Sequence, residues 1–270
     1  MTDAGPRRGR LLIIGGAERR AGAILARFVA LAGGPLARIV VIATASRAPD
    51  ALAAEYVSAF TDLGAPSVSS RRIETRAQAN DPAVADLLAP ATGVFFTGGD
   101  QLRITAVLGG TLVDSRLQSL VADGSVVLAG TSAGAAMMSS TMIVGGDGPG
   151  VTTGSVRTGP GLEFLPGVLI DMHFAERGRL NRLLSAVARN PHELGLGIDE
   201  DTAILTGGDC FEVLGSGSVT VVDAGGASDI RVPADGPIAL AGARIHVLPA
   251  GYRFHLKGRR PAIDERGRAA

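Results

Sequence analysis

Short apolar runs separated by stretches with helical periodicity occupy the first half of this 270-residue sequence. The runs are "LLIIGG" (11–16), "RIVVIATAS" (38–46), "SVSSRRIET" (67–75), "GVFFTGG" (93–99) and "SVVLAG" (125–130). The first two are continuous and β-branched, as expected of strands that are buried on both faces. Because strands alternate here with helices, the sequence predicts a parallel, doubly wound α/β sheet.

Two helical stretches follow the first two strands. Their apolar residues recur at helical spacing, as Ile24, Phe28 and Leu31 in one and Leu52, Tyr56, Phe60 and Leu63 in the other. The segment 143–167 is rich in Gly and Pro, and it predicts a long surface excursion of a kind that is usually functional or disordered. After it, "VLIDMHF" (168–174) predicts a strand, and Leu180, Leu183, Leu184 and Val187 predict the apolar face of a helix.

The remaining sequence predicts short strands that extend or flank the sheet. We expect a single catalytic domain at 11–257 between flexible termini at 1–10 and 258–270.

Charge and composition restrict the function classes. Lys+Arg and Asp+Glu both total 26, so no global field favours nucleic acid or a membrane as partner. The single Cys210 excludes an intrachain disulfide, which fits a reducing compartment. The N-terminus "MTDAGPRRGR" lacks the apolar core of a signal peptide. These features favour a cytoplasmic enzyme.

Ser132 lies in "GTSAG" (130–134), which matches the G-x-S-x-G nucleophile pattern. A buried strand precedes it and Ala-rich helical sequence follows, as the pattern requires. The amide of Ala133 then lies at a helix N-terminus, where it can stabilise an oxyanion. The alternative is an ordinary Gly-rich turn whose serine has no chemical role.

Other residues supply partners for this serine. His173 follows an apolar strand, at the sheet edge where α/β proteins bind ligands. Glu200 lies between two aspartates in "LGIDEDTA" (196–203), and an imidazolium would offset the repulsion among these acids; a solvated acidic turn is the alternative. Asp171 could also reach His173, because residues two apart on a strand face the same side. Gly99, after another strand, could provide a second oxyanion donor.

Taken together, these segments resemble the cyanophycinase-type serine exopeptidases of peptidase family S51, which are related to aspartyl dipeptidase (peptidase E). The matching motifs are "LLIIGGAE" (11–18), "FFTGGDQLR" (95–103), "GTSAGAAMM" (130–138), "DMHFAERGRLNRLL" (171–184), "GIDEDTAI" (197–204) and "HVLPAGYRF" (246–254). The order serine, histidine, acid differs from that of an α/β-hydrolase, which runs serine, acid, histidine.

The resemblance implies a class I glutamine amidotransferase-like α/β fold, flavodoxin-like, and a homodimer without metal or cofactor. It implies a Ser132–His173–Glu200 triad, with the oxyanion held by the amides of Gly99 and Ala133. The implied substrate is cyanophycin, a poly-aspartate with arginine amide-linked to each β-carboxyl, which such enzymes cut to β-Asp-Arg dipeptides.

The resemblance also implies a set of substrate-binding residues, namely Asp100, Gln101, Arg103, Asp171, Arg177, Arg179 and Arg182. Arginines near a helix N-terminus oppose the helix dipole, and bidentate binding of substrate carboxylates would explain them; solvation or pairing with acids is the alternative. One departure is Met172, where cyanophycinases carry Gln, and Met accepts hydrogen bonds only weakly. An S51-type peptidase for aspartyl or isoaspartyl dipeptides, or a non-catalytic binding protein on the same fold, are the competing hypotheses.

Overall fold

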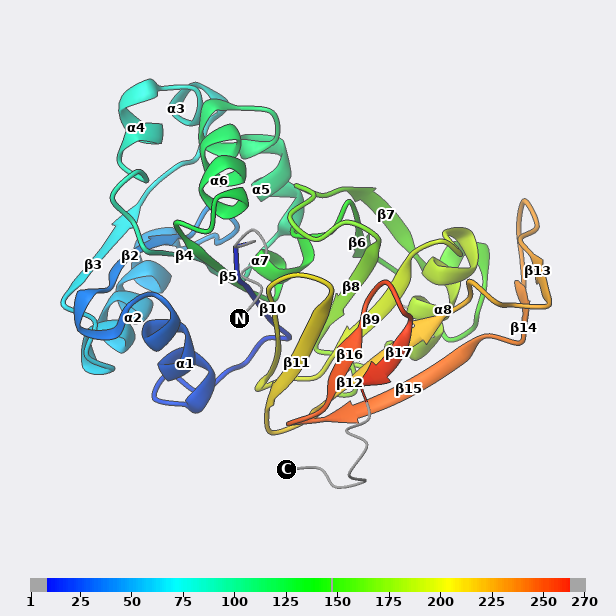
Figure 1. The fold of residues 1–270 in the computed structure, drawn as a ribbon. Helices are drawn as coiled ribbons and strands as arrows, with labels where there is room; N and C mark the ends of the chain where they lie inside the picture. Colours follow the sequence, from blue (N-terminus) through cyan, green and yellow to red (C-terminus); the bar gives the residue numbers. More distant parts are fainter. Residues whose placement is uncertain (1–8, 147, 263–270) are drawn as a thin grey trace.

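A nine-stranded sheet forms the centre of the computed structural model, which describes residues 9–146 and 148–262 (Figure 1). Its parallel part has the order β3-β2-β4-β5-β1 and comprises β1 (Leu11–Ile14), β2 (Arg38–Ile42), β3 (Ser67–Arg71), β4 (Gly93–Phe96) and β5 (Val127–Thr131). The antiparallel strands β10 (Thr202–Thr206), β11 (Cys210–Gly215), β16 (Arg253–His255) and β17 (Arg260–Ala262) continue it beyond β1. The predicted α/β class with a mostly parallel sheet is confirmed.

Helices cover both faces of the parallel part. They are α1 (Ala23–Leu31) and α2 (Pro49–Asp62) on one face, and α3 (Arg76–Ala79), α4 (Pro82–Asp86), α5 (Gln101–Leu108) and α6 (Leu112–Ala122) on the other, with a 3-10 turn η1 (Gly34–Leu36) after α1 (Figure 1). Side chains of a strand alternate between the faces, so Leu12 and Ile14 pack with Phe28 of α1, while Leu11 and Ile13 share a core with α5 and α6. This double burial explains why β1, β2 and β4 are continuous apolar runs, whereas β3, at the edge of the sheet, is polar and partly exposed.

A second sheet of four strands lies beside the first. It has the order β15-β12-β9-β8 and comprises β8 (Val168–Met172), β9 (Leu194–Ile198), β12 (Ser218–Asp223) and β15 (Arg244–Pro249). The helix α8 (Leu180–Arg189) packs on it over Gly195, where a Cβ would lie 2.6 Å from Val187. The ring of Phe174, which precedes α8, covers Gly197, where a Cβ would lie 2.5 Å from that ring. Leu183 and Val187 are buried and Leu184 is partly buried, as predicted, whereas Leu180, the first residue of α8, is exposed.

The predicted surface excursion contains regular structure. Strands β6 (Thr141–Gly145) and β7 (Arg157–Pro160) form an antiparallel hairpin with the short 3-10 helix η2 (Thr153–Ser155) between them. The Gln101 side chain donates to the Ile143 carbonyl (2.8 Å), and the Asn181 side chain donates to the Pro149 carbonyl (2.7 Å). Side chains from outside the segment therefore bind its backbone and order a stretch whose Gly and Pro content predicted a loop. A further hairpin of β13 (Asp229–Arg231) and β14 (Ala239–Ala241) projects at one end of the molecule (Figure 1).

The ordered chain extends past the predicted boundary at residue 257. Strand β17 lies inside the predicted C-terminal tail, where it pairs with β16 and thus lengthens the sheet by one strand. At the other end, the Gly9 amide donates to the Val121 carbonyl (2.8 Å). The rest of both predicted termini, residues 1–8 and 263–270, lies outside the described residues. Of the helices described, none has the length and apolar character needed to cross a membrane.

Candidate active site

Ser132 occupies a sharp turn between β5 and the short helix α7 (Ala133–Ala136). Its backbone has φ +52° and ψ −109°, a strained conformation of a kind that costs about 1–3 kcal/mol. The residues two positions before and two positions after Ser132 have to be glycine. A Cβ at Gly130 would lie 2.1 Å from the Gly134 carbonyl oxygen, and one at Gly134 would lie 2.4 Å from the Phe96 carbonyl oxygen. The G-x-S-x-G pattern is therefore a packing requirement of this turn, which presents the serine at the carboxyl edge of the sheet.

Ser132, His173 and Glu200 form a continuous hydrogen-bonded chain. Ser132 Oγ lies 2.9 Å from His173 Nε2, and His173 Nδ1 lies 2.6 Å from Glu200 Oε1. His173 directly follows β8, and Glu200 lies in the turn between β9 and β10. With the proton on Nδ1, where Glu200 accepts it, Nε2 is free to accept the hydroxyl hydrogen of Ser132. This geometry is that of a serine nucleophile with an oriented general base.

The turn after β1 holds the backbones around all three residues. The Ser132 amide donates to the Ile14 carbonyl (3.0 Å), the His173 amide to the Gly15 carbonyl (2.8 Å), and the Asp201 amide to the Gly16 carbonyl (2.9 Å). Gly16 has φ +111°, and a Cβ there would lie 2.3 Å from Cε1 of His173. No role for this turn was predicted from the sequence. The signal that could have found it is the glycine pair at the carboxyl end of a buried strand.

The three consecutive acids have separate partners. Asp199 is buried and accepts hydrogen bonds from the Ala175 amide (3.1 Å) and from the Ser218 amide and hydroxyl (3.0 and 2.9 Å). Asp201 accepts from the Arg19 amide (3.2 Å) and the Ser216 hydroxyl (3.0 Å). Only Glu200 reaches the imidazole. The acidic turn is thus built to fix one carboxylate against His173.

Two backbone amides near Ser132 suit an oxyanion. Ala133 is the first residue of α7, so its N–H has no partner within the helix. Gly99 has φ +142°, and a Cβ there would lie 2.2 Å from the Ala45 oxygen. Within residues 9–146 and 148–262, neither N–H has a hydrogen-bond partner. Both amides are therefore available to a ligand.

A hollow of about 320 Å³ opens beside the serine and the histidine. Its lining comprises Gly99, Gln101, Ser132, Val144, Gly145, Gly146, Arg157, Met172, His173, Arg177, Arg179 and Arg182. It thus unites Gln101 and the three arginines after the histidine with the nucleophile. Arg157, contributed by β7, is a member of the lining that the sequence analysis did not single out.

Three of the predicted substrate-binding residues are not in this lining. Asp100 caps α5 by accepting from the Leu102 amide (2.9 Å), and Arg103 donates to the Ser46 carbonyl (2.8 Å). Asp171 is fully buried and accepts from Nε of Arg182 (2.9 Å).

The strand alternation that would direct Asp171 toward His173 does not apply. His173 lies beyond the end of β8 with φ +50°, and its ring bonds to Ser132 and Glu200 instead.

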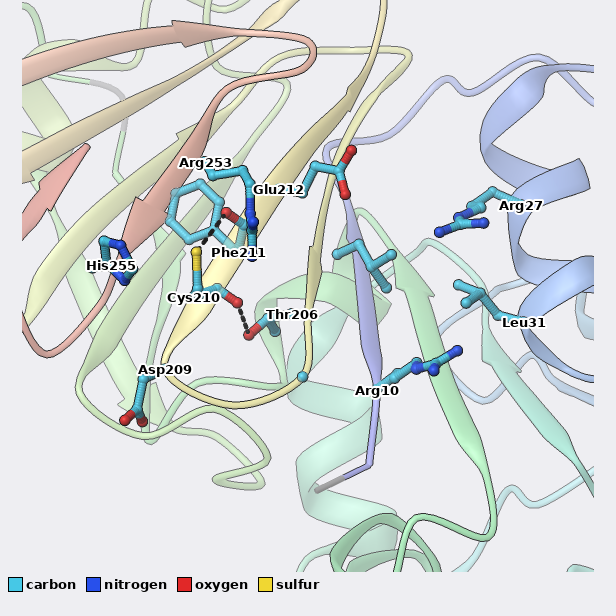
Figure 2. A pocket seen from close by; sticks show the side chains of 12 residues that line it. Arg10, Arg27, Leu31, Thr206, Asp209, Cys210, Phe211, Glu212, Arg253 and His255 are labelled. Atoms are coloured by element: carbon cyan, nitrogen blue, oxygen red, sulfur yellow. Dashed lines mark hydrogen bonds between the residues drawn. The ribbon is translucent and has the colours of Figure 1, made fainter. Parts of the chain in front are cut away.

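A second hollow, of about 470 Å³, lies at the opposite edge of the sheet, where β1 begins and β10 ends (Figure 2). Its lining includes Arg10, Arg27, Glu212 and Arg253, and Cys210, which is half-buried. None of the predicted site residues lines it. Among the described residues, no group of three or more His, Cys, Asp or Glu side chains could hold a metal ion.

Comparison with known proteins gives a consistent result. The pattern of Peptidase family S51 matches residues 11–214. A cyanophycinase of Geminocystis herdmanii (strain PCC 6308) is 40% identical over 261 residues, which are 94% of this chain and 96% of the relative. A cyanophycinase of Trichormus variabilis (strain ATCC 29413 / PCC 7937) is 42% identical over 254 residues, covering 91% of this chain and 85% of the relative.

Solved structures support the fold alone, because their identities are low. A peptidase from an acI-B1 Actinobacterium superposes with a TM-score of 0.70 at 22% identity, covering 93% of this chain and 98% of the other. A putative peptidase E protein from Listeria monocytogenes EGD-e gives a TM-score of 0.53 at 17% identity, covering 77% of this chain and 97% of the other.

Proposed function

Because the chain belongs to peptidase family S51, we propose that it is a serine exopeptidase that hydrolyses the poly-aspartate backbone of cyanophycin and releases β-Asp-Arg dipeptides. The observation that carries the proposal is the Ser132–His173–Glu200 hydrogen-bonded chain beside an arginine-rich hollow, in a chain about 40% identical to cyanophycinases over most of its length.

The first step forms an acyl-enzyme. His173 Nε2 takes the hydroxyl proton of Ser132 while Oγ attacks the scissile carbonyl carbon. Glu200 keeps Nδ1 protonated and stabilises the imidazolium that forms. The negative charge on the carbonyl oxygen is met by the amides of Gly99 and Ala133, and a donor of this kind contributes about 3 kcal/mol to the transition state. Acylation is complete when His173 gives the hydroxyl proton to the departing amine and the C–N bond breaks, which leaves the ester on Ser132.

The second step regenerates the enzyme. A water molecule attacks the ester carbonyl while His173 takes one of its protons, and His173 then returns that proton to Ser132 Oγ as the ester C–O bond breaks and the carboxylate product leaves.

The charge of the hollow fits this substrate. Among the described residues, its lining has four arginines and no acidic side chain. Each repeat of cyanophycin carries one free α-carboxylate, so the polymer offers an anion at every dipeptide unit. Guanidinium groups bind carboxylates in a planar, bidentate manner, which fixes orientation as well as charge.

Met172 favours a second candidate within the same family. Its sulfur lies 3.7 Å from Nη1 of Arg179, in the wall of the hollow, so this position offers the substrate no strong polar group. A peptidase acting on aspartyl or isoaspartyl dipeptides would need fewer such contacts. A homodimer, which the family resemblance implies, and a cytoplasmic location, which the single cysteine fits, complete the proposal; the mass of the protein in solution tests the dimer.

The two substrate classes are separated by direct assay. Purified protein is incubated with cyanophycin granules and, separately, with isoaspartyl dipeptides, and products are identified by mass spectrometry. Release of β-Asp-Arg from granules supports the proposal. Cleavage of the dipeptides with intact granules supports the second candidate, and cleavage of neither favours a non-catalytic binding protein.

A further inference from the structure

We propose that Arg157, presented by the β6–β7 hairpin in the wall of the hollow that contains Ser132, binds an arginine α-carboxylate of the substrate. This inference deepens the proposed function and rests on it. It assigns a specificity-determining role to a residue outside the motifs that characterise the sequence.

The four arginines of the hollow differ in their environment. Arg182 is buried, and its guanidinium bonds to both carboxylate oxygens of Asp171 and to the Gly146 carbonyl (3.1 Å). Arg179 donates to the Met172 carbonyl and lies 3.5 Å from Asp171. Both guanidiniums pair with the buried carboxylate of Asp171, so their first role is to shape the wall.

Arg157 and Arg177 are exposed instead. Across residues 9–146 and 148–262, neither has an acidic partner or a hydrogen bond from its side chain. Both nevertheless line the hollow that contains Ser132. Their charges are therefore the ones available to an incoming anion.

Hydrogen bonds from side chains of α5 and α8 fix the backbone of the hairpin that carries Arg157. Strand β6 is attached to α5 through the bond from Gln101 to the Ile143 carbonyl (2.8 Å). On the α8 side, the Arg189 side chain donates to the Val156 carbonyl (3.3 Å), next to Arg157 itself. These contacts hold β6 and the residue that precedes Arg157, which reduces the entropy lost when a ligand binds.

Gly145 provides the space for this side chain. It pairs with Arg157 across the hairpin, and a Cβ at Gly145 would lie 2.7 Å from Nη2 of Arg157. The guanidinium therefore lies over bare backbone in the wall of the hollow, where a side chain would exclude it. A planar guanidinium that has no partner among residues 9–146 and 148–262, at the edge of a catalytic hollow, is suited to bidentate carboxylate binding.

The test combines a protein change with a substrate change. Arg157→Ala is compared with wild type and with Arg116→Ala, a control whose arginine forms only a surface ion pair with Asp86. The substrates are a short synthetic β-Asp-Arg oligomer and the same oligomer with each arginine α-carboxylate converted to the amide. We expect Arg157→Ala to raise KM for the free carboxylate about tenfold with kcat nearly unchanged, and to have little effect on the amidated oligomer.

Two kinetic results would overturn the inference. An unchanged KM, or an equal loss on both oligomers, overturns the inference, because Arg157 would then not act through the arginine α-carboxylates. Binding of β-Asp-Arg to Ser132→Ala, measured by calorimetry with and without Arg157→Ala, gives a second readout that needs no turnover. If the wild type cleaves neither oligomer, the proposed function fails, while calorimetry still decides the inference: about tenfold weaker binding supports it, and unchanged or absent binding overturns it.

Discussion

Replacing Gly16 by alanine tests whether the turn after β1 positions the catalytic histidine. In the structure, a Cβ at this position would lie 2.3 Å from Cε1 and 2.7 Å from Nε2 of His173. To reach an ordinary contact distance of 3.4 Å, the ring has to move by about 1 Å. That ring is held by bonds of 2.9 Å to Ser132 and 2.6 Å to Glu200, so movement in any direction disturbs at least one of them.

The expected cost follows from this displacement. A misplacement of about 1 Å in a catalytic group lowers the rate by about 10²-fold, which corresponds to about 2.7 kcal/mol in the activation barrier. The effect should fall on kcat, with KM little changed, because Gly16 is not in the lining of the hollow. The assay is steady-state cleavage of a β-Asp-Arg oligomer, with thermal unfolding to establish that the variant is folded.

A matched control separates positioning from backbone strain. Gly208 has φ +119°, close to the φ +111° of Gly16, and no atom lies within 4 Å of where its Cβ would be. Gly208→Ala should therefore lose comparable stability and keep its kcat. If Gly16→Ala retains the kcat of Gly208→Ala, the histidine does not depend on this turn and the reasoning is refuted.

Three further predictions concern the triad and two buried acids. Glu200→Gln should lower kcat by about 10³-fold without unfolding the protein, because the imidazolium loses its counter-charge, and steady-state kinetics with circular dichroism checks this. Burial raises the pKa of Glu193 above its ordinary value of 4.5, and the Oε2 atom of this side chain is buried without a hydrogen bond. The folded protein therefore favours the neutral carboxyl, and the stability that the neutral form contributes is lost as pH rises through the raised pKa. Glu193→Gln should therefore unfold at a higher temperature than wild type at pH 8 but not at pH 4, and an equal change at both would count against this explanation. Burial tends to raise the pKa of Asp223, but the Gly225 amide, Arg259 and Arg244 outweigh it, so the pKa is lowered from its ordinary value of 3.8. The ionised carboxylate therefore stabilises the fold above pH 3.8, and this contribution is lost as pH falls through the lowered pKa. Asp223→Asn should lower the free energy of unfolding by about 1–3 kcal/mol at pH 7, and denaturant titrations at pH 7 and pH 3 should show the difference shrinking with acid.

The parallel sheet was predictable because local sequence determines it. Leu12 and Ile13 are buried on opposite faces of the sheet, so both had to be apolar. A few consecutive apolar residues are therefore enough to predict such a strand. Ser132 was predictable for a similar reason, since the glycines at 130 and 134 are required by contacts within or next to the same turn. The resemblance to a known family supplied the residues that are distant in sequence.

The second sheet and the hairpin could not be read in the same way. Residues Gly195 and Gly197 weaken the strand signal of β9, although they are there to let α8 and Phe174 approach. The β6–β7 hairpin is ordered by side chains such as Gln101, which is 42 residues from its partner Ile143. The prediction that Asp171 could reach His173 assumed that both residues lie on one strand with alternating side chains. It fails because β8 ends at Met172, before His173.

The most direct test of the account is to react the protein with a fluorophosphonate and map the modified residue by mass spectrometry, with and without a β-Asp-Arg oligomer present. A serine nucleophile activated by His173 and Glu200 predicts modification at Ser132, slowed by the oligomer because both compete for one hollow. Modification elsewhere, labelling of Ser132 that the oligomer does not slow, or no labelling while a reference serine hydrolase reacts, would contradict it.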